Sequence, residues 1–326
     1  MPFSIARLGH VELRVTDIER AREFYVGLLG FVETERDSRR LYLRGYEERY
    51  HHSIALKEEA SAGLSHFAFR VSSEEDLDSL ESLFRSRDLP VVKLEKGEER
   101  GVGRAIRVQD PTGFPVEFYY EMKEVGSMLQ RFHLYRGARP MRIDHVNCQT
   151  PNVALGHDFY VNQLGFKVSE YTVGRDGSLW GSWLFRKQNV HDIAIMRGTG
   201  PRLHHVGVWM PDAASVLWVC DILAGAGKQE MIERGPGRHG LSNAFFLYIR
   251  DQDGNRVEFY TGDYMTADPD WKPIKWSIED RNRATFWGHV PPQSWFDEAT
   301  PVESVLDGTL IKPVQVISDD RPSFVT

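Results

Sequence analysis

An internal repeat that spans most of the chain's 326 residues constrains the fold more than any other feature of the sequence. Residues 8–35, LGHVELRVTDIERAREFYVGLLGFVETE, are echoed by residues 143–170, IDHVNCQTPNVALGHDFYVNQLGFKVSE. Two later stretches repeat in the same way, since residues 52–71 and 106–121 match residues 191–210 and 247–262. Each copy begins as a period-two strand, continues as a helix and enters its next strand through glycine. Two homologous halves are therefore expected.

The repeat predicts an α+β fold of two homologous domains, each made of paired βαβββ modules, with a C-terminal arm. We place the first domain at residues 1–136, the second at 137–263 and the arm at 264–326. The arm is rich in proline and tryptophan and has little periodicity, but it is too aromatic for a disordered tail. We expect it to pack over the second half or against a neighbouring subunit.

The composition narrows the class of partner. Forty basic and 47 acidic residues give a net charge of -7, which argues against nucleic acid or an anionic membrane and favours a small soluble ligand. The two cysteines, Cys148 and Cys220, support neither a disulfide framework nor a thiolate metal site. No apolar run approaches the roughly 20 residues of a membrane span, and no signal-peptide pattern opens the sequence. We therefore expect a cytoplasmic protein.

Three polar side chains lie on predicted inward faces of three strands in the second half. Alternation in residues 141–147 puts His145 and Asn147 on one face, and the repeat selects His205 rather than His204 as the inward histidine of its strand. Residues 244–250 and 256–260 form a strand-turn-strand unit that turns Glu258 inward, where a carboxylate needs a cation. Two imidazoles and one carboxylate form the ligand set expected for non-haem Fe(II), with Mn(II) a close competitor.

The first half repeats this triad without its neutral hydrogen-bonding neighbours. His10, His66 and Glu117 match the three predicted ligands, and the counterparts of Asn147, Tyr248 and His239 are Glu12, Arg107 and Glu98. Charged neighbours would perturb both the ligand pKa values and substrate binding. We therefore predict one metal per chain, in the second half, and a structural remnant in the first.

A spaced motif in the second half identifies a family. It consists of Gly237, His239, Leu247, Tyr248, Asp251, Gly254 and Glu258. This spacing resembles the signature of type I extradiol ring-cleaving dioxygenases of the vicinal oxygen chelate superfamily, except that Gln252 stands where the pattern has proline. The stretches RIDHVN, WLFRKQNVHD, RLHHVG, IERGPGRHGLSNAF and DRNRATFWG extend the likeness over nearly the whole chain.

The resemblance implies a vicinal oxygen chelate (glyoxalase-like) fold and a catalytic second domain. Its implied metal ligands are His145, His205 and Glu258; its catalytic residues are His191 (acid–base), His239, Tyr248 and Asn147; its substrate-binding residues are Arg234, Arg283 and Trp183. The likeness is greatest to enzymes that cleave 3,4-dihydroxyphenylacetate (homoprotocatechuate) with O2 at the 2,3-bond. Their product is 5-carboxymethyl-2-hydroxymuconate semialdehyde, an intermediate of aromatic catabolism. The resemblance also implies a homo-oligomer, with four subunits.

Other interpretations of the same residues stay open. The chain could cleave another substituted catechol, act as a glyoxalase-like metal isomerase, or sequester a ligand without catalysis. His191 could be a solvated strand-end histidine, and Tyr248 could be packed in a barrel. Arg234 and Arg283 could pair with neighbours such as Glu233 or Asp280.

Overall fold

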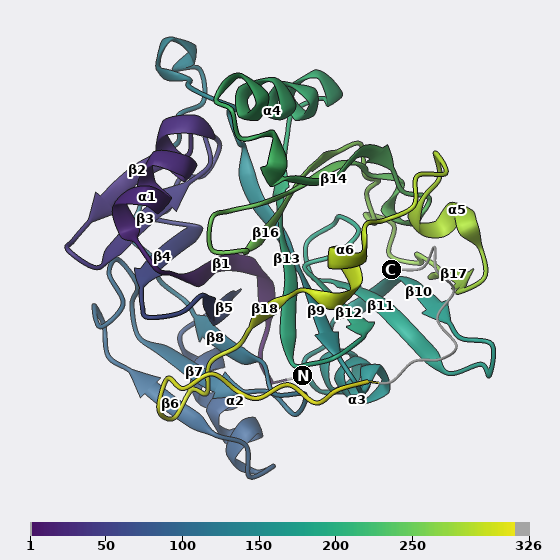
Figure 1. Cartoon of the computed structure of the whole chain (residues 1–326). Helices are drawn as coiled ribbons and strands as arrows, with labels where there is room; N and C mark the ends of the chain where they lie inside the picture. Colours follow the sequence, from purple (N-terminus) through teal and green to yellow (C-terminus); the bar gives the residue numbers. More distant parts are fainter. Residues whose placement is uncertain (1, 317–326) are drawn as a thin grey trace.

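Two mixed β-sheets built on one plan form the body of the protein, in a computed structural model that describes residues 2–316 (Figure 1). The elements of the first half are β1 (Ile5–Val15), α1 (Ile18–Arg22), β2 (Val32–Arg36), β3 (Arg40–Arg44), β4 (Ile54–Glu58), β5 (Gly63–Val71), α2 (Glu75–Arg85), β6 (Val91–Leu94), β7 (Ala105–Gln109) and β8 (Pro115–Tyr119). The elements of the second half are β9 (Arg142–Thr150), α3 (Val153–Asp158), β10 (Lys167–Val173), β11 (Leu179–Phe185), β12 (Ile193–Arg197), β13 (Arg202–Trp209), α4 (Ala213–Gly225), β14 (Ile232–Arg238), β15 (Phe245–Arg250) and β16 (Arg256–Thr261). The linker between the halves holds one short 3-10 turn, Phe132–Leu134.

The strand order is the same in both sheets. The first runs β2-β3-β4-β1-β5-β8-β7-β6, and the second runs β14-β15-β16-β13-β9-β12-β11-β10 and then β17. Reading the second sheet backwards from β10 reproduces the first, with each strand replaced by the one eight places later. The predicted α+β fold of two homologous halves, each of paired βαβββ modules, is confirmed.

The same helix-to-strand connection occurs in both halves. Each first helix passes into a π-helical turn, Glu23–Leu28 or Phe159–Gln163, and then into a glycine with positive φ. The φ values are +80° at Gly30 and +74° at Gly165, in the left-handed region that only glycine enters at little cost. At Gly30 a Cβ would also lie 2.1 Å from the carbonyl oxygen of Arg136 in the interdomain linker. The glycine in each repeat therefore fixes this turn.

The two halves share one apolar core. Rings from the first half meet rings from the second, as in the edge-to-face contacts of Phe69 with Phe166 (5.2 Å between centroids) and of Phe84 with Phe159 (5.5 Å). Burial of this aromatic surface stabilises the association of the domains. The opposite face of the second sheet carries the polar side chains described below.

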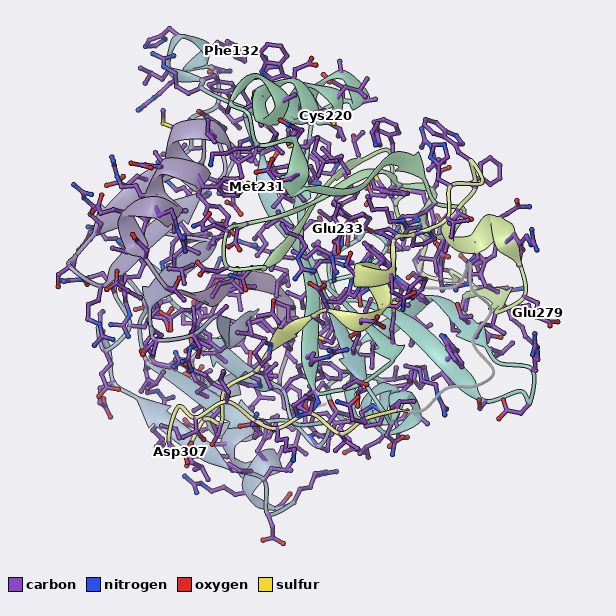
Figure 2. All side chains as sticks on the ribbon, viewed as in Figure 1. Phe132, Cys220, Met231, Glu233, Glu279 and Asp307 are labelled. Atoms are coloured by element: carbon purple, nitrogen blue, oxygen red, sulfur yellow. The ribbon has the colours of Figure 1, made fainter. Side chains whose placement is uncertain are left out.

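The C-terminal arm packs over the second half and then crosses to the first. Its elements are β17 (Ile274–Ser277), α5 (Arg281–Ala284), α6 (Gln293–Asp297) and β18 (Thr300–Pro301). Strand β17 extends the second sheet by pairing with β10, and β18 pairs with β13. In Figure 2, Glu279 and Asp307 of the arm lie at opposite sides of the molecule.

The arm makes buried polar contacts with the first domain. Glu303 accepts hydrogen bonds from Arg14 Nη1 and Ser65 Oγ, both at 2.9 Å. Residues 317–326, the end of the predicted arm, lie outside the described residues. None of the helices in residues 2–316 is long and apolar enough to cross a membrane.

Candidate active site

A cavity of about 410 Å³ opens over the central strands of the second sheet. Strands β9, β13, β15 and β16 form its floor, and Arg283, Ala284 and Trp295 of the arm contribute to its wall. Of the ten residues predicted to form the site, the structure places nine in the lining: His145, Asn147, Trp183, His191, His205, His239, Tyr248, Glu258 and Arg283. The remaining one, Arg234, lies behind the wall.

The three predicted metal ligands converge at the floor of this cavity. His145 Nε2 lies 3.3 Å from His205 Nε2 and 2.9 Å from Glu258 Oε2, and His205 Nε2 lies 3.3 Å from the same carboxylate oxygen. Ligand atoms about 2.1 Å from an ion and at right angles are about 3 Å apart, so this triangle matches one face of an octahedron.

Strand register brings the ligands together. Gly207 of β13 pairs with both His145 of β9 and Glu258 of β16, and Glu258 in turn pairs with Tyr248 of β15. These four positions form one row across the sheet, and His205 lies on the same face two residues before Gly207. A Cβ at Gly207 would lie 2.2 Å from the His145 ring, so this glycine gives the imidazole its space.

A carboxylate behind His145 sets its tautomer. His145 Nδ1 donates to Asp144 Oδ2 at 3.2 Å, and both oxygens of Asp144 accept from Asn189 Nδ2 at 2.9 Å. With Nδ1–H held there, Nε2 is the atom that faces the centre of the triangle, and it can present a lone pair to a metal that displaces its own proton. Burial would lower the pKa of His145, but Asp144 and Glu258 outweigh it and raise the pKa to about 9.

His204 and a backbone carbonyl of the arm set the tautomer of His205. His204 Nε2 donates to the carbonyl oxygen of Trp295 at 3.2 Å, which leaves His204 Nδ1 as an acceptor 2.8 Å from His205 Nδ1. His205 can then donate through Nδ1 and present Nε2 as a ligand. Burial lowers the pKa of His205 to about 4, so the ring is neutral.

The donor set suits a divalent transition metal. Two imidazole nitrogens and one carboxylate oxygen all lie within 4.8 Å of one another, and each residue offers one ligand atom. Burial would raise the pKa of Glu258, but its contacts with the His145 and His205 rings outweigh this effect and lower the pKa well below its usual value, so the carboxylate is ionised. The remaining directions face the cavity, so the residues present fit Fe(II) or Mn(II) with room for exchangeable ligands.

His191 stands beside the ligands in a neutral state. Its ring centroid lies 4.0 Å from that of His145. Burial and the neighbouring His145 lower the pKa of His191 well below its usual value. Its Nδ1 is buried without a hydrogen-bond partner among the described residues. Lys187 Nζ donates to the His191 carbonyl at 2.9 Å, which fixes the backbone that carries the ring. His191 is therefore a buried, neutral imidazole at the cavity wall, not a solvated strand end.

His239 and Tyr248 form a hydrogen-bonded pair on the other side. His239 Nδ1 donates to the carbonyl of Ala284 at 2.7 Å, and its Nε2 is 3.0 Å from the Tyr248 hydroxyl. Burial lowers the pKa of His239 to about 3, so the neutral ring accepts at Nε2 and Tyr248 donates. Burial also raises the pKa of Tyr248 well above its usual value, which keeps the hydroxyl protonated.

Asn147 and Trp183 complete the predicted lining. Asn147 Nδ2 donates to the sulfur of Met196 at 3.3 Å, while its buried Oδ1 has no hydrogen-bond partner among the described residues. Trp183 packs with Met196 and Leu241 in a small apolar cluster. The site thus offers a neutral amide and a flat apolar wall, both suited to an aromatic ligand.

Two buried guanidiniums lie at the arm side of the cavity. Arg283 is 1% exposed and Arg234 is 6% exposed. Arg234 stacks over the Trp295 ring at 4.3 Å and donates through Nη2 to the Ala284 carbonyl at 2.9 Å. Burial and the charge of Arg234 lower the pKa of Arg283 to about 10. Glu233, one alternative partner for Arg234, pairs instead with Arg256.

The residues that hold the predicted ligands in place are not marked by any motif in the sequence. Asp144 directly precedes His145, and Asn189 lies two residues before His191. A polar residue so close to a predicted site residue is the only feature of the sequence that could have pointed to them. His204 was expected to point away from the site, but an irregularity in β13 between Leu203 and His205 turns it onto Trp295. Nothing in the sequence pairs Trp295 with this position.

The chain matches one family model in both of its halves. Residues 7–118 and 142–259 each match the Glyoxalase/Bleomycin resistance protein/Dioxygenase superfamily. A manganese-dependent 2,3-dihydroxybiphenyl 1,2-dioxygenase of Geobacillus genomosp. 3 is 34% identical over 88% of this chain and 95% of that protein. A metapyrocatechase of Geobacillus stearothermophilus is 33% identical over 92% and 95%.

Solved structures resemble the fold throughout. Homoprotocatechuate 2,3-dioxygenase from Arthrobacter globiformis is 41% identical, with a TM-score of 0.93, covering 95% of this chain and 96% of that one. The Brevibacterium fuscum enzyme in an anaerobic complex with 3,4-dihydroxyphenylacetate is 40% identical, with a TM-score of 0.93 and coverage of 96% and 98%. The family resemblance expected from the sequence is confirmed.

Proposed function

We propose that the substrate of this chain is 3,4-dihydroxyphenylacetate. The chain belongs to the glyoxalase/bleomycin resistance protein/dioxygenase superfamily, and it is an extradiol dioxygenase, which acts on a catechol and O2. Cleavage at the 2,3-bond would give 5-carboxymethyl-2-hydroxymuconate semialdehyde. The observation that carries this proposal is the pair of buried arginines, Arg283 in the cavity wall and Arg234 directly behind it.

The metal is Fe(II) or Mn(II), and His145, His205 and Glu258 are its proposed ligands. When bound, the ion lowers the pKa of the catechol hydroxyls that chelate it and supplies the redox chemistry between catechol and O2. The chain fixes the ring orientation of the two histidine ligands through Asp144 and His204.

His191 is the proposed acid–base residue. Because it is neutral and its Nδ1 is free to accept, it can take a proton from the second catechol hydroxyl and return it later to a developing oxyanion. The position of its ring is set by the Lys187 contact with its backbone and by the adjacent His145 ring.

Tyr248, His239 and Asn147 are proposed to orient the reactants. Tyr248 keeps a protonated hydroxyl in the row of ligands, and His239 fixes the direction of that hydroxyl. The single Tyr248 proton points to His239 Nε2 in this arrangement, so stabilising negative charge as it develops on a reactant requires the hydroxyl to turn that proton toward the oxyanion. The unpaired Oδ1 of Asn147 can accept from a catechol hydroxyl.

The arginines are proposed to recognise the substrate carboxylate. Burial is the main cause that lowers the pKa of each guanidinium to about 10, and each also feels the positive charge of its neighbours. A carboxylate beside Arg283 would offset both effects through charge-assisted hydrogen bonds. Arg234 is separated from the cavity by Ala284 and Trp295, so we expect it to act through charge and by holding the arm.

The test compares 3,4-dihydroxyphenylacetate with unsubstituted catechol. We expect the wild type to prefer the carboxylate substrate and Arg283→Ala to lose about 2 to 4 kcal/mol of that preference in kcat/KM. Arg281→Ala, at an exposed position of the same helix, is the matched control and should keep the wild-type ratio. Equal kcat/KM for both catechols in the wild type would favour another substituted catechol as substrate.

The alternatives outside ring cleavage are separated by oxygen uptake. We expect colour when a catechol is added without air and O2 consumption once air is admitted. An isomerase or a sequestering protein would bind without consuming O2. The homo-oligomer and the cytoplasmic location stay predictions.

A further inference from the structure

The first domain contains a second copy of the ligand triangle. His10 Nε2 lies 3.2 Å from His66 Nε2 and 3.5 Å from Glu117 Oε1, and His66 Nε2 lies 3.7 Å from Glu117 Oε2. All three side chains are completely buried. The strands are equivalent too, because Ala68 of β5 pairs with both His10 and Glu117 as Gly207 does in the second domain. By geometry alone this triangle is close to the proposed catalytic one.

Two charged side chains fill the face that the second domain leaves open. Arg107 Nη2 donates to Glu117 Oε2 at 2.6 Å and to Glu99 Oε2 at 2.8 Å, and it lies 3.4 Å from His66 Nε2. Glu99 also reaches His10 Nε2 at 2.9 Å and His52 Nε2 at 3.2 Å. The internal repeat predicts Glu98 as the counterpart of His239. In the structure Glu98 is exposed, and Glu99 is the buried glutamate of the cluster.

The position of Arg107 in the repeat is informative. Arg107 pairs with Glu117 across β7 and β8 as Tyr248 pairs with Glu258 across β15 and β16. Where the second domain has a neutral hydroxyl facing a cavity, the first has a guanidinium inside the ligand cluster. Four groups, His10, His66, Glu99 and Glu117, offer donor atoms within 4.8 Å of one another around it.

We propose that the guanidinium of Arg107 is a built-in cation that occupies a latent metal centre of the first domain, whose ligands are His10, His66, Glu99 and Glu117. A divalent ion and a guanidinium cannot both be stable among these carboxylates, because two cations at hydrogen-bonding distance repel strongly in a buried site. The native first domain therefore binds no divalent ion. Replacing Arg107 with a neutral residue leaves two buried carboxylates and two imidazoles, a set that accepts Mn(II), Fe(II) or Co(II).

The latent site differs from the catalytic one in its outer contacts. The Nδ1 atoms of His10 and His66 are buried without hydrogen-bond partners among the described residues, whereas His145 and His205 have Asp144 and His204. Outer contacts of this kind change metal affinity by about 10- to 100-fold. The opened site should therefore bind metal more weakly than the second-domain site by about that factor. This inference does not depend on which substrate is cleaved.

The experiment measures Co(II) binding in a background where the second-domain site is disabled. Glu258→Ala alone should bind no Co(II), and Glu258→Ala combined with Arg107→Met should bind one ion per chain, read by equilibrium dialysis and by visible absorption. Adding His66→Ala to that pair should abolish the new site. The thermal midpoint of the Glu258→Ala, Arg107→Met protein should rise with Co(II) concentration and that of Glu258→Ala should not, because an ion that binds only the folded chain stabilises it.

Two outcomes would overturn the proposal. One is Co(II) that Glu258→Ala binds with Arg107 present and that is lost when His66→Ala is added, since the guanidinium would then not exclude metal from the first domain. The other is a folded Arg107→Met or Arg107→Gln protein, in the same background, that takes up no Co(II). Arg107→Gln keeps a polar side chain of similar reach and provides the test if the methionine variant does not fold. Co(II) that Glu258→Ala still binds after His66→Ala is added would lie outside the first-domain cluster, and would count against the proposed catalytic ligands and not against this proposal.

Discussion

The environment of His191 gives this residue the features of a proton carrier. Its imidazole is buried and neutral, and its Nδ1 lacks a partner among the described residues. The sequence alone left its role open, because a histidine before β12 could equally have been solvated. The ring contact with His145 at 4.0 Å and the Lys187 bond to its carbonyl distinguish the two cases.

His191→Asn should therefore keep metal and bind catechol but slow turnover by about 10²-fold or more, the usual size of a general acid–base contribution. Metal content, anaerobic catechol binding and kcat across pH are the measurements. His157→Asn is the control, because His157 is half-buried on α3 and contacts Ser182 rather than the cavity. Unchanged kcat across the pH range would remove His191 from the mechanism.

Glu258 and Glu117 are repeat-equivalent carboxylates with different predicted roles. Glu258→Ala should abolish metal retention and activity, because it removes a proposed ligand from a buried triangle. Glu117→Ala should keep both but lower the free energy of unfolding by about 2 kcal/mol or more, because Arg107 loses a charged hydrogen-bond acceptor. Metal analysis, O2 uptake and urea unfolding test the pair. An inactive, folded Glu117→Ala protein would contradict the assignment.

At the level of elements, the sequence predicted which side chains face the site wherever a strand alternates regularly between its two faces. His145, His205 and Glu258 could be placed on one face because their strands alternate around the row through Gly207. The positions of Arg234 and His204 could not be predicted in this way, because their strands break the period of two. The register is irregular in β14 on both sides of Arg234 and in β13 before His205. The arm was recognised as ordered from its aromatic content. Its route could not be predicted, because its contacts are not periodic.

The arm is linked to the site through Trp295 and His204, and this link can be tested. His204→Phe should weaken metal binding by about 10- to 100-fold, because His205 loses the acceptor that fixes its tautomer. Metal affinity measured by chelator competition is the readout. Trp295→Phe should keep most of the affinity, since the hydrogen bond uses the backbone carbonyl of that residue. An unchanged affinity in His204→Phe would show that His205 is held by other contacts.

At the scale of the whole molecule, two equivalent hydrogen bonds join the domains. The hydroxyl of Tyr25 in the first domain donates to Asp251 Oδ2 in the second, and that of Tyr160 in the second donates to Asp110 Oδ2 in the first, both at 3.0 Å. Each tyrosine comes from the first π-helical turn of its domain and each aspartate from the turn before its last strand. The repeat predicted the equivalence of these residues. Their contact across the domains could not be predicted, because it depends on how the two sheets pack.

The Asp251 contact makes stability depend on pH. Burial raises the pKa of Asp251 to about 6, against about 3.9 for an unfolded aspartate. The folded chain therefore holds this proton more tightly than the unfolded chain does. The resulting stability is fully present below about pH 4 and is lost as the pH rises through about 6, by roughly 2 to 3 kcal/mol in total.

Asp251→Asn, whose neutral side chain keeps the shape of the protonated carboxyl, should lack this decline. The measurement is the free energy of unfolding in urea at pH 4.5 and pH 8, on metal-free protein so that protons and metal do not compete at the ligands. The difference between wild type and Asp251→Asn should favour the variant more at the higher pH. Asp270→Asn, an exposed carboxyl in the arm, should follow the wild-type profile. If wild type and Asp251→Asn gave parallel profiles, the buried carboxyl would not take up a proton between these pH values. Asp251 would then be ionised at both pH values while it accepts the hydrogen bond from Tyr25.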